Sequence, residues 1–547
     1  MLYGSAEGGA MLDVLVVGAG FGGLHMLWKL RELGFSAECV DAADDVGGVW
    51  HSNHYPGARC DVESLVYSYT FSPEIDAEWR WTERYAAQPE IQRYLAFVAD
   101  RLDLRSLIRF STRVEKAHFN EADNTWTVVT HRGAVISVRY LILATGPISA
   151  PVMPDIPGIE DFSGQTFHTA LWPADKPDFT GKRVGLIGTG SSGVQSIPLI
   201  AEQAGRLTVF LRTPNFVVPA RNHPLSDADQ AKWDAEKHYI RDAIWAGEIG
   251  GAGDVLMERE LIEARKPAGE YSPEQQHYYL QRRWDWGGGV TMSAFSDVLV
   301  NPSTNDVVAD FLRSKIRETV RDPGTAELLT PRGYYVGTRR ICVGTGFYET
   351  FNRSNVDVVD VRARPIERIT ARGVVVNGEE YPLDYIVFAT GFDAVTGALT
   401  RIDLRGVAGR TIQDAWAQGP QTYLGIAVQG FPNMLMIGGP GSPSVLSIVV
   451  QTNEMQVDWI GRLLTTLREQ GKVRFDVAPG YQDAWTEHVN EVVKRTLFST
   501  SDSWYVGANI PGKPRAILAY TGGIRAYREK CRSVFGEDGS VEGLITA

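Results

Sequence analysis

Asp13-Val-Leu-Val-Val-Gly-Ala-Gly-Phe-Gly-Gly23 sets the architecture expected of this chain. The residues before the first glycine form a run typical of a buried strand, and the glycines have the G-x-G-x-x-G spacing of a dinucleotide-binding turn. A helical pattern follows as far as Gly34, and a second strand-like run, 37–40, ends at Asp41. Backbone N–H groups at such a helix start can approach a pyrophosphate, and the acid can accept hydrogen bonds from a ribose. The stretch therefore predicts a nucleotide-binding domain.

A second copy of this pattern lies further along the chain. The strand-like run 182–187 leads into Gly188-Thr-Gly-Ser-Ser-Gly193, and a helical pattern then reaches another strand-like run, 207–211. Arg212 and Thr213 stand where the first copy has its acid. An acid would repel a 2′-phosphate, whereas a guanidinium offers it a bidentate, charge-assisted partner. The second nucleotide is therefore predicted to be NADP(H) rather than NAD(H); the alternative is an ordinary surface arginine.

Each glycine pattern has a matching strand that ends in Ala-Thr-Gly, at 139–146 and at 384–393. Together they predict an α/β fold with two Rossmann-like dinucleotide-binding domains, the second inserted in the first. Charged residues at helical spacing predict an additional helical insertion. The expected division of the chain is an FAD-binding domain of 1–150 with 384–547, an NADP-binding domain of 151–221 with 331–383, and a helical insertion of 222–330.

Composition narrows the possible function classes. The 547 residues carry a formal net charge of −12, which argues against a general nucleic-acid binder, so an anionic coenzyme needs locally placed basic residues. The 4 cysteines are widely spaced without a C-x-x-C pair, which predicts a reducing compartment and neither a disulfide framework nor a metal site. Residues 1–10 do not resemble a signal peptide, and no apolar run approaches the ~18 residues of a membrane span. The sequence favours a cytoplasmic, multidomain protein.

Two loops follow the first glycine pattern. In 46–50, adjacent glycines permit close approach of the backbone to a flat ring. The second loop, 55–61, ends at Asp61, which is interpreted either as a loop carboxylate or as a partner of Arg59. Beyond these loops, an amphipathic helix is predicted over 89–102, because its apolar residues share one face.

Strand-like character returns at 334–342 and again at 348–355. The first of these runs contains Arg339 and Arg340, which point to opposite faces if the run is a strand. Two arginines on opposite faces can serve two different anions. A solvated basic pair is the alternative interpretation.

A proline-rich segment, 147–157, marks a crossing between domains. The stretch that follows, Phe162-x-Gly164-x-x-x-His168-x-x-x-Trp172-Pro173, lies between the two glycine patterns and resembles the fingerprint of Baeyer–Villiger monooxygenases. The likeness extends from residue 12 to residue 545 and is closest to the phenylacetone and steroid monooxygenase branch. It is carried by GGVW, YPGARCD, IGTGSSG, GTRR, FATGFDAVTGAL, GPGSPSVLS and SWYVGANIPGKPR.

The resemblance implies that the protein binds FAD and NADPH. For FAD it implies contacts from Gly18, Gly20, Gly23 and Asp41 to the ADP part, and from Gly48, Val49, Trp50, Asp61 and Tyr67 nearer the flavin. For NADPH it implies contacts from Gly188, Thr189, Gly190, Ser191, Ser192, Gly193, Arg212, Thr213 and Arg339. Trp504 corresponds to a residue of a mobile loop that closes over the nicotinamide cofactor.

The resemblance also assigns the chemistry. Arg340 takes the place of the catalytic arginine, and Asp61 takes that of the carboxylate that orients it. NADPH reduces FAD, and the reduced flavin adds O2 to form a C4a-peroxyflavin that converts a ketone to an ester or a lactone. A permanently charged guanidinium stabilises the negative charge that develops in such a site. The position of 162–173 implies a coupling role for His168 rather than direct catalysis.

Three other functions compete with this one. A flavin-dependent N- or S-oxygenase would use the same peroxyflavin, and product analysis distinguishes it. A disulfide reductase needs a cysteine pair near the flavin, which the cysteine spacing does not support, and a non-enzymatic NADPH-binding regulator is the third.

The sequence also indicates a substrate class and an assembly. The run at 442–446 resembles that of relatives acting on bulky aryl or cyclic ketones, so a bulky aryl, cyclic or steroid-like ketone is expected as the small-molecule partner, with O2. His51, Ser52 and Ile448 depart from the family pattern near the places associated with flavin or substrate, and Arg339 replaces a usual lysine. The protein is expected to be a monomer or a homodimer.

Overall fold

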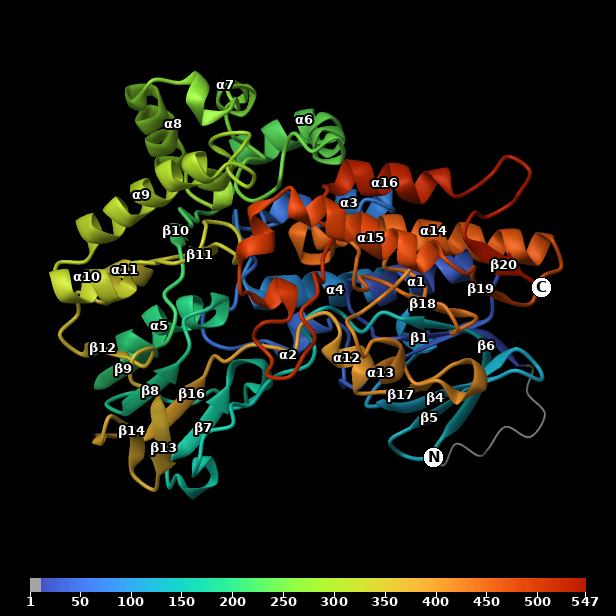
Figure 1. Ribbon diagram of the computed structural model, residues 1–547, viewed down its shortest axis with the longest axis horizontal. Coiled ribbons are helices and arrows are strands. Elements are labelled where there is room, and N and C mark those ends of the chain that lie inside the picture. The colour runs from blue at the N-terminus through green and yellow to red at the C-terminus, as the bar shows by residue number, and fades with distance from the viewer. Residues whose placement is uncertain (1–10) are drawn as a thin grey trace.

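The computed structural model describes residues 11–547 and places two largely parallel sheets next to each other (Figure 1). The first glycine pattern belongs to one sheet, and the second glycine pattern belongs to the other. A helical region, green to yellow in Figure 1, lies above the second sheet, and orange and red C-terminal helices lie above the first. The expectation about a signal peptide concerns residues 1–10, which lie outside the described residues.

The first sheet has eight strands in the order β17-β4-β5-β6-β1-β2-β3, with β18 also paired to β6. β1 runs parallel to β2 and to β6, and Val17 lies opposite Val40 and Leu143. Residues 14–16 are fully buried, which fits the central position of β1. The strands are β1 (Leu12–Val17), β2 (Ala37–Val40), β3 (Ile108–Arg109), β4 (Val114–Asn120), β5 (Thr125–Thr130), β6 (Val135–Leu143), β17 (Asp403–Arg405) and β18 (Met434–Met436).

Helices from both ends of the chain accompany this sheet. The helix predicted over 89–102 is confirmed as α4, and Ile91, Tyr94, Leu95 and Val98 on its apolar face are buried. A short antiparallel pair, β19 (Phe475–Val477) with β20 (Leu544–Thr546), follows near the C-terminus. The helices are α1 (Phe21–Glu32), α2 (Val49–Ser52), α3 (Pro73–Glu78), α4 (Gln88–Arg101), α12 (Gly397–Thr400), α13 (Ile412–Ala415), α14 (Val449–Glu469), α15 (Tyr481–Lys494) and α16 (Ile524–Ser533).

The second sheet has five strands, all parallel, in the order β12-β9-β8-β16-β7. Helix α5 (Ser191–Gln203) connects β8 to β9 and completes the predicted βαβ unit. A separate antiparallel sheet of β13 (Ile366–Thr370), β14 (Gly373–Val376) and β15 (Glu379–Pro382) precedes β16. The strands of the second sheet are β7 (Gln165–His168), β8 (Arg183–Ile187), β9 (Arg206–Leu211), β12 (Val356–Asp360) and β16 (Tyr385–Phe388). The α/β class with two dinucleotide-binding folds is thereby confirmed.

The expected domain boundary at residue 384 is wrong for β16. A boundary at that residue places the strand in the first domain, but β16 lies between β8 and β7 in the second sheet. Packing at the end of the strand gives the physical reason. A Cβ at Gly188 would lie 2.5 Å from the carbonyl oxygen of Ala389, just as a Cβ at Gly18 would lie 2.5 Å from that of Ala144. Each Ala-Thr-Gly segment therefore packs against the first glycine of its own sheet.

The stretch 162–173 is more than a connector between domains. Its residues 165–168 form β7, the edge strand of the second sheet, and Phe388 of β16 lies opposite His168. Trp172 is buried against Phe179 in the core of the same domain. The stretch is thus anchored in the second sheet by strand pairing and by aromatic packing.

The segment 222–330 consists of helices and loops, and no strand longer than a single bridge occurs among these described residues. Helix-capping side chains begin its longer helices, for example Ser226 before α6 and Ser272 before α8. The parallel pair β10 (Val217–Pro219) and β11 (Cys342–Gly344) lies where the chain leaves and returns. The helices are α6 (Asp227–Ala246), α7 (Arg259–Glu263), α8 (Pro273–Trp286), α9 (Pro302–Thr319) and α10 (Pro323–Leu329).

Two predicted strands are absent from the described chain. The run 334–342 is a turn and a loop, and β11 begins only at its last residue. Gly337 has a φ of +86°, and this conformation interrupts an extended run. The run 348–355 is also wrong as a strand, because Gly346, with a φ of +67°, starts the short helix α11 (Phe347–Thr350).

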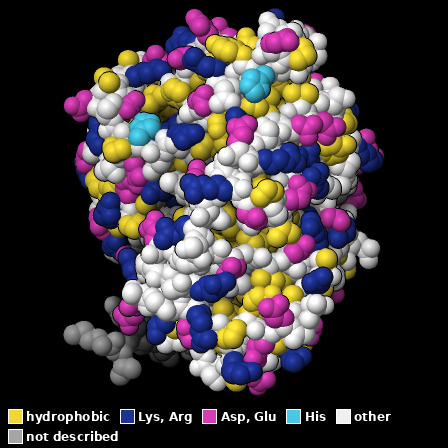
Figure 2. Space-filling view, turned by 90° about the vertical axis from the view of Figure 1, so that its left-hand side faces the viewer, with side chains coloured by type: hydrophobic (Ala, Val, Ile, Leu, Met, Phe, Trp, Pro, Cys, Tyr) yellow, Lys and Arg dark blue, Asp and Glu magenta, His cyan; other side chains and the backbone are white. Residues whose placement is uncertain are grey.

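The surface carries mixed charge on the face drawn in Figure 2. Basic and acidic side chains alternate there, and neither sign forms a continuous field. That face therefore lacks the extended basic surface that a nucleic-acid backbone requires.

Among residues 11–547, no helix combines the length and the apolar character needed to cross a bilayer. The four cysteines are buried and free.

Candidate functional site

The first glycine pattern forms a cradle at the N-terminus of α1. Gly18 has a φ of +109°, and a Cβ there would lie 2.5 Å from the carbonyl oxygen of Ala144, so only glycine fits. A Cβ at Gly23 would lie 1.7 Å from the carbonyl oxygen of Gly18. Gly20 caps the helix, and the nearest atom to a Cβ there is the Cα of Gly48 at 3.5 Å. The residues fit a dinucleotide pyrophosphate, as FAD binding requires.

Asp41 lies directly after β2, beside this cradle. Its Oδ2 accepts the N–H of Ala19 at 2.6 Å, and its Oδ1 accepts the N–H of Ala43 at 2.8 Å. Burial raises the pKa of Asp41, and the two N–H groups oppose that shift. Each carboxylate oxygen retains a further lone pair for a ribose hydroxyl. The predicted ribose contact is therefore compatible with a side chain that also fixes the glycine turn.

The residues assigned nearer the flavin lie on two neighbouring segments. Gly48, with a φ of +56°, caps α2, and Val49 is the first residue of that helix. The Nε1 of Trp50 donates a hydrogen bond to the hydroxyl of Tyr67 at 3.0 Å. Tyr67 is buried and packs edge-on against Trp50. The structure thus brings Trp50 and Tyr67 together, next to Val49.

The second glycine pattern repeats the first cradle at the N-terminus of α5. Gly188 has a φ of +110°, and a Cβ at Gly193 would lie 2.3 Å from the carbonyl oxygen of Gly188. Gly190 caps the helix, and nothing lies within 4 Å of a Cβ placed there. This open position leaves room for a second pyrophosphate. The turn is completed by Thr189, Ser191 and Ser192.

Arg212 and Thr213 follow β9 beside the second cradle. The hydroxyl of Thr189 donates to the carbonyl oxygen of Thr213 at 3.1 Å, which ties the glycine turn to this end of the strand. Arg212 is exposed, and it makes no ion pair or side-chain hydrogen bond with any residue of 11–547. A guanidinium without a protein partner beside an open glycine turn suits a 2′-phosphate.

Removing this guanidinium is expected to weaken NADPH relative to NADH. For Arg212→Ala we expect the KM for NADPH to rise about 10- to 100-fold while the KM for NADH changes little, because one or two charge-assisted hydrogen bonds are lost. Steady-state kinetics with both coenzymes measure this ratio. Arg206→Ala is the matched control, because Arg206 lies at the other end of β9 and pairs with Asp357. An unchanged NADPH-to-NADH preference in Arg212→Ala would contradict the assignment.

Arg340 and Asp61, 279 positions apart, form a bidentate ion pair. The Nε of Arg340 lies 2.6 Å from Oδ2 of Asp61, and Nη2 lies 2.7 Å from Oδ1. The remaining nitrogen, Nη1, donates to the carbonyl oxygen of Val445 at 2.8 Å. The alternative partner, Arg59, instead pairs with Glu83 at 2.7 Å, so that interpretation of Asp61 is wrong. The two residues that the resemblance assigned to the chemistry lie in contact.

This ion pair is charged and fixed in orientation. Burial favours the neutral acid, but Arg340 outweighs it and holds the pKa of Asp61 below its usual value. Burial likewise disfavours the guanidinium, but Asp61 raises the pKa of Arg340. The guanidinium is held by a carboxylate and by a backbone carbonyl. A preorganised cation of this kind can stabilise negative charge that develops on a bound substrate.

Arg339 contacts a different part of the molecule from Arg340. Its Nη2 donates to the carbonyl oxygen of Asp502 at 2.6 Å, and its guanidinium lies 4.9 Å from the ring centroid of Tyr334. The hydroxyl of Tyr334 donates to the carbonyl oxygen of Pro214 at 2.9 Å, close to the end of β9. The interpretation of the two arginines as a solvated pair is therefore wrong. Arg339 connects the end of β9 to the C-terminal segment.

Trp504 begins a short 3₁₀-helix, Trp504–Val506, in that C-terminal segment. Its ring centroid lies 4.2 Å from that of Tyr505. It also packs against Val395 and Leu518, so it lies near the chain that follows β16. Closure of this segment over a nicotinamide cofactor stays a prediction.

His168 is hydrogen-bonded at both ring nitrogens. Nδ1 accepts the N–H of Ala170 at 3.0 Å, so Nε2 carries the proton and donates to the hydroxyl of Thr390 at 3.2 Å. That hydroxyl in turn donates to the carbonyl oxygen of Val152 at 2.7 Å. Burial lowers the pKa of His168, which favours the neutral ring. The side chain links the edge of the second sheet to the proline-rich crossing.

Loss of this link is expected to reduce the coupling of NADPH oxidation to product formation while FAD stays bound. For His168→Ala we expect coupling to fall about 2- to 10-fold, the range for loss of one neutral hydrogen bond that positions a segment. The ratio of product to NADPH consumed is the measurement, with the flavin absorbance as a check. His118→Ala is the control, because His118 pairs with Asp403 at the edge of the first sheet. Wild-type coupling in His168→Ala would count against a linking role.

Some contributors to the site left no recognisable pattern in the sequence. Val445 contributes only its carbonyl oxygen, and any residue has one. Gln195 on α5 accepts the hydroxyl of Tyr55 at 2.8 Å and donates to the carbonyl oxygen of Arg59 at 2.9 Å. A Cβ at Gly57 would lie 2.3 Å from the carbonyl oxygen of Gln195. The loop that carries Asp61 is therefore packed on α5, the helix of the second cradle. The turn-like sequence of this loop does not predict that contact.

Known proteins share this arrangement over nearly the whole chain. Residues 12–222 match a family described as flavin-binding monooxygenase-like. The chain is 42% identical to a Baeyer–Villiger monooxygenase of Pseudooceanicola batsensis, covering 96% of this chain and 95% of that protein. It is 40% identical to a phenazine N-monooxygenase of Lysobacter antibioticus, covering 97% and 96%. A solved structure of oxidized steroid monooxygenase bound to NADP superposes with a TM-score of 0.91 at 44% identity, covering 98% and 99%.

Proposed function

Because the chain belongs to the Baeyer–Villiger monooxygenase family, we propose that it converts ketones to esters or lactones with FAD, NADPH and O2. One oxygen atom of O2 enters the bond between the carbonyl carbon and its neighbour, the other leaves as water, and NADPH supplies the two electrons. FAD, when bound, carries those electrons to O2 and supplies the activated oxygen. The bidentate pair of Arg340 with Asp61, on a loop packed against the second cradle, is the observation that carries the proposal.

In this proposal Arg340 stabilises the negative charge that develops on the ketone oxygen during attack. Asp61 holds two of its nitrogens and Val445 holds the third, so the guanidinium keeps its orientation throughout the reaction. Because the donors are fixed before the substrate arrives, little reorganisation accompanies the reaction. Asp61 is thus a positioning residue, and Arg340 is the catalytic residue.

The coenzyme site follows from the second cradle. Gly188, Gly190 and Gly193 would receive the pyrophosphate, and Arg212 with Thr213 would receive the adenosine end. Arg339 keeps the positive charge of the lysine usual at its position. In addition it holds the carbonyl of Asp502, two residues before Trp504, and this contact supports closure of the C-terminal segment over the coenzyme.

The substrate is proposed to be a bulky apolar ketone, either aryl, cyclic or steroid-like. Ile448 supports this, because it is buried three residues from the carbonyl that holds Arg340. A Cβ at Gly251 would lie 2.7 Å from its Cδ1 and 3.1 Å from Cγ2 of Val66. Close relatives carry a polar residue at the position of Ile448, so an apolar side chain replaces a polar one here. His51, by contrast, pairs with Asp44 and is not part of this contact.

A second candidate is N-oxygenation, which the similarity to a phenazine N-monooxygenase favours. The two reactions differ in their need for a fixed cation. Insertion next to a carbonyl builds negative charge on the former carbonyl oxygen, whereas in oxygen transfer to an aromatic nitrogen the nitrogen lone pair attacks and no carbonyl oxygen takes up charge. Equal N-oxide yields from wild type and Arg340→Ala, with no ester from either, would favour the second candidate.

Purified protein provides the first test of the proposed function. We expect it to be yellow, to release FAD on denaturation, and to consume NADPH and O2 in equal amounts when a ketone is added. A colourless protein that binds NADPH without consuming it would instead fit a non-enzymatic regulator. Chromatography identifies the released flavin, and an oxygen electrode measures the consumption of O2.

A further inference from the structure

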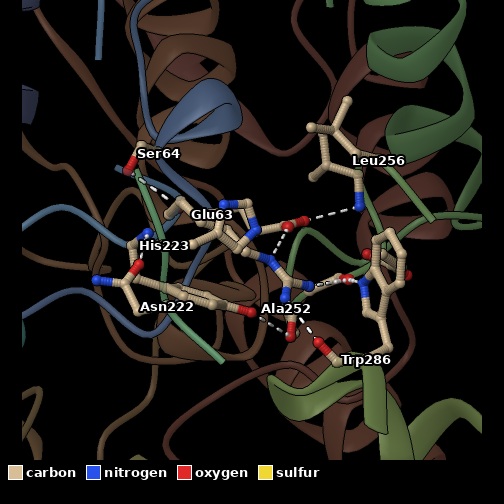
Figure 3. Close-up of polar contacts among 12 residues, drawn as sticks. Glu63, Ser64, Asn222, His223, Ala252, Leu256 and Trp286 are labelled. Atoms are coloured by element: carbon tan, nitrogen blue, oxygen red, sulfur yellow. Dashed lines mark hydrogen bonds and ion pairs between the residues drawn. The ribbon is translucent and has the colours of Figure 1, made fainter. Parts of the chain in front are cut away.

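A deeply buried ion pair lies two residues from Asp61. The Nε of Arg84 donates to Oε1 of Glu63 at 2.6 Å, and the two side chains are only 5% and 3% exposed. Charges buried to this extent are costly unless they are paired and fully hydrogen-bonded. Figure 3 shows Glu63 near the centre of a polar network, with Ser64 on one side and Ala252 and Trp286 on the other.

Every polar group of Glu63, in the backbone and in the side chain, makes a hydrogen bond. Its N–H donates to the carbonyl oxygen of Gly251 at 2.9 Å, and its Oε2 accepts the N–H of Val255 at 2.7 Å. Its own carbonyl oxygen accepts the N–H groups of Val66 and Tyr67, both at 3.2 Å. One residue therefore joins the loop 251–255 of the helical region to the start of the segment that carries Tyr67.

Arg84 extends the same network to a second part of the helical region. Its Nη1 donates to the carbonyl oxygen of Trp286 at 2.8 Å, and its Nη2 donates to that of Gly253 at 2.7 Å. Its guanidinium also lies 5.2 Å from the ring centroid of Trp286. The carbonyl oxygen of Arg84 accepts the N–H of Ser64 at 2.8 Å. Both members of the ion pair thus hold segment 61–67 against the helical region.

We propose that Glu63 and Arg84 are positioning residues for the monooxygenase reaction. Their ion pair keeps the carboxylate of Asp61 in the position where it accepts hydrogen bonds from Arg340. Only Val62 separates Asp61 from Glu63, and Val62 is buried, so displacement of Glu63 moves Asp61. Tyr67, at the other end of the segment, shares its N–H between the carbonyl oxygens of Glu63 at 3.2 Å and of Ser64 at 3.0 Å. The inference rests on the proposed function, because it assigns these residues to the support of Asp61 and Arg340.

The first test removes the charge on one partner. In Glu63→Gln, an NH2 group replaces one of the two accepting oxygens and faces a donor in either orientation, Arg84 Nε–H or Val255 N–H, so segment 61–67 loses its fixed position. We expect the ester formed per NADPH to fall about 10- to 100-fold, the effect of a small displacement at a reacting centre. The KM for NADPH and the rate of flavin reduction are expected to stay unchanged. Coupling assays and stopped-flow reduction measure these quantities.

The matched control is Asp76→Asn. Asp76 also joins the first domain to the helical region, because it pairs with Lys237 at 2.8 Å and with Arg241 of α6, and its side chain is 13% exposed. It makes no contact with segment 61–67 among its hydrogen bonds. We expect this variant to melt at a lower temperature with wild-type coupling. A coupling loss equal to that of Glu63→Gln would overturn the inference.

A double variant separates positioning from stability. In Glu63→Leu/Arg84→Met, an apolar pair replaces the charges, a change that often preserves or raises stability. We expect the folded protein to bind FAD but to couple as poorly as Glu63→Gln, because the side-chain bonds of Glu63 and Arg84 to the loop 251–255 are missing. Recovery of wild-type coupling would show a purely structural role and would overturn the inference.

Hydrogen exchange on the FAD-free proteins gives a readout that does not depend on activity. We expect the amides of 61–67 to exchange about tenfold faster in Glu63→Gln than in wild type. In Asp76→Asn we expect them to exchange at the wild-type rate. Equal exchange in wild type and Glu63→Gln would overturn the inference. If the wild type forms no ester from any ketone, the proposed function fails instead, and the exchange data still decide whether the pair holds this segment.

Discussion

Arg340→Ala is expected to keep FAD bound and to lose ester formation by about 10²- to 10³-fold, the cost of removing one preorganised donor to a developing negative charge. NADPH oxidation should continue, because Arg340 contacts Asp61 and Val445 rather than the second cradle. The two electrons then reduce O2 to hydrogen peroxide without transfer of an oxygen atom to the ketone, so hydrogen peroxide should account for the NADPH consumed. Product analysis together with a peroxide assay measures both effects.

Two comparisons make this prediction specific. Arg340→Lys keeps a positive charge but cannot form the bidentate contact, so its ester yield should lie between those of wild type and Arg340→Ala. Arg101→Ala is the matched control, because Arg101 forms a bidentate pair with Glu78 that is exposed to solvent. It should behave as wild type. Substantial ester formation by Arg340→Ala would refute the catalytic assignment.

Gly23→Ala is expected to abolish FAD binding, whereas Gly193→Ala is expected to keep FAD and to abolish its reduction by NADPH. In each cradle the added Cβ collides with backbone, 1.7 Å from the oxygen of Gly18 in one and 2.3 Å from that of Gly188 in the other. The helix start must move in either case, and the N–H groups that face a pyrophosphate move with it. Flavin absorbance after purification measures the first effect, and anaerobic mixing with NADPH measures the second.

The two glycine variants control for each other, since both change a buried glycine at the start of a helix. Chemical reduction with dithionite should still bleach the flavin of Gly193→Ala, which places the defect at the coenzyme. Gly269→Ala is a further control, because nothing lies within 4 Å of a Cβ at that position. A yellow Gly23→Ala protein with stoichiometric FAD would contradict the assignment of the first cradle.

Local patterns predicted the two cradles well because their determinants are local. The alternation of an apolar strand, close-spaced glycines and an apolar helix face is imposed within about 30 residues of a βαβ unit. The strand predicted over 334–342 failed because Gly337 adopts a positive φ that hydrophobic pattern does not register. The sequence pattern predicts the strand Tyr385–Phe388 but not the sheet to which it belongs, since strand order depends on packing between distant segments.

The partner of Asp61 shows the same limit within the site. Residue spacing alone suggested Arg59, two positions away, and only the family resemblance pointed to Arg340. In the folded chain Arg59 forms an ion pair with Glu83. The fold brings Asp61 into contact with Arg340, 279 positions away in the sequence. The contribution of Val445 has no side-chain signature, because it is a backbone carbonyl. The partners that Glu63 and Arg84 find in the loop 251–255 and at Trp286 are likewise backbone groups.

Incubation of the wild-type enzyme with a bulky aryl or cyclic ketone, NADPH and ¹⁸O2 shows directly whether an oxygen atom of O2 enters the ketone. We expect an ester or lactone that carries one ¹⁸O atom, seen by mass spectrometry as a gain of about two mass units over the product made in ordinary oxygen, with one NADPH consumed per product. Recovery of unchanged ketone while NADPH is consumed and hydrogen peroxide accumulates, across linear, cyclic, aryl and steroid ketones, would contradict the proposed function.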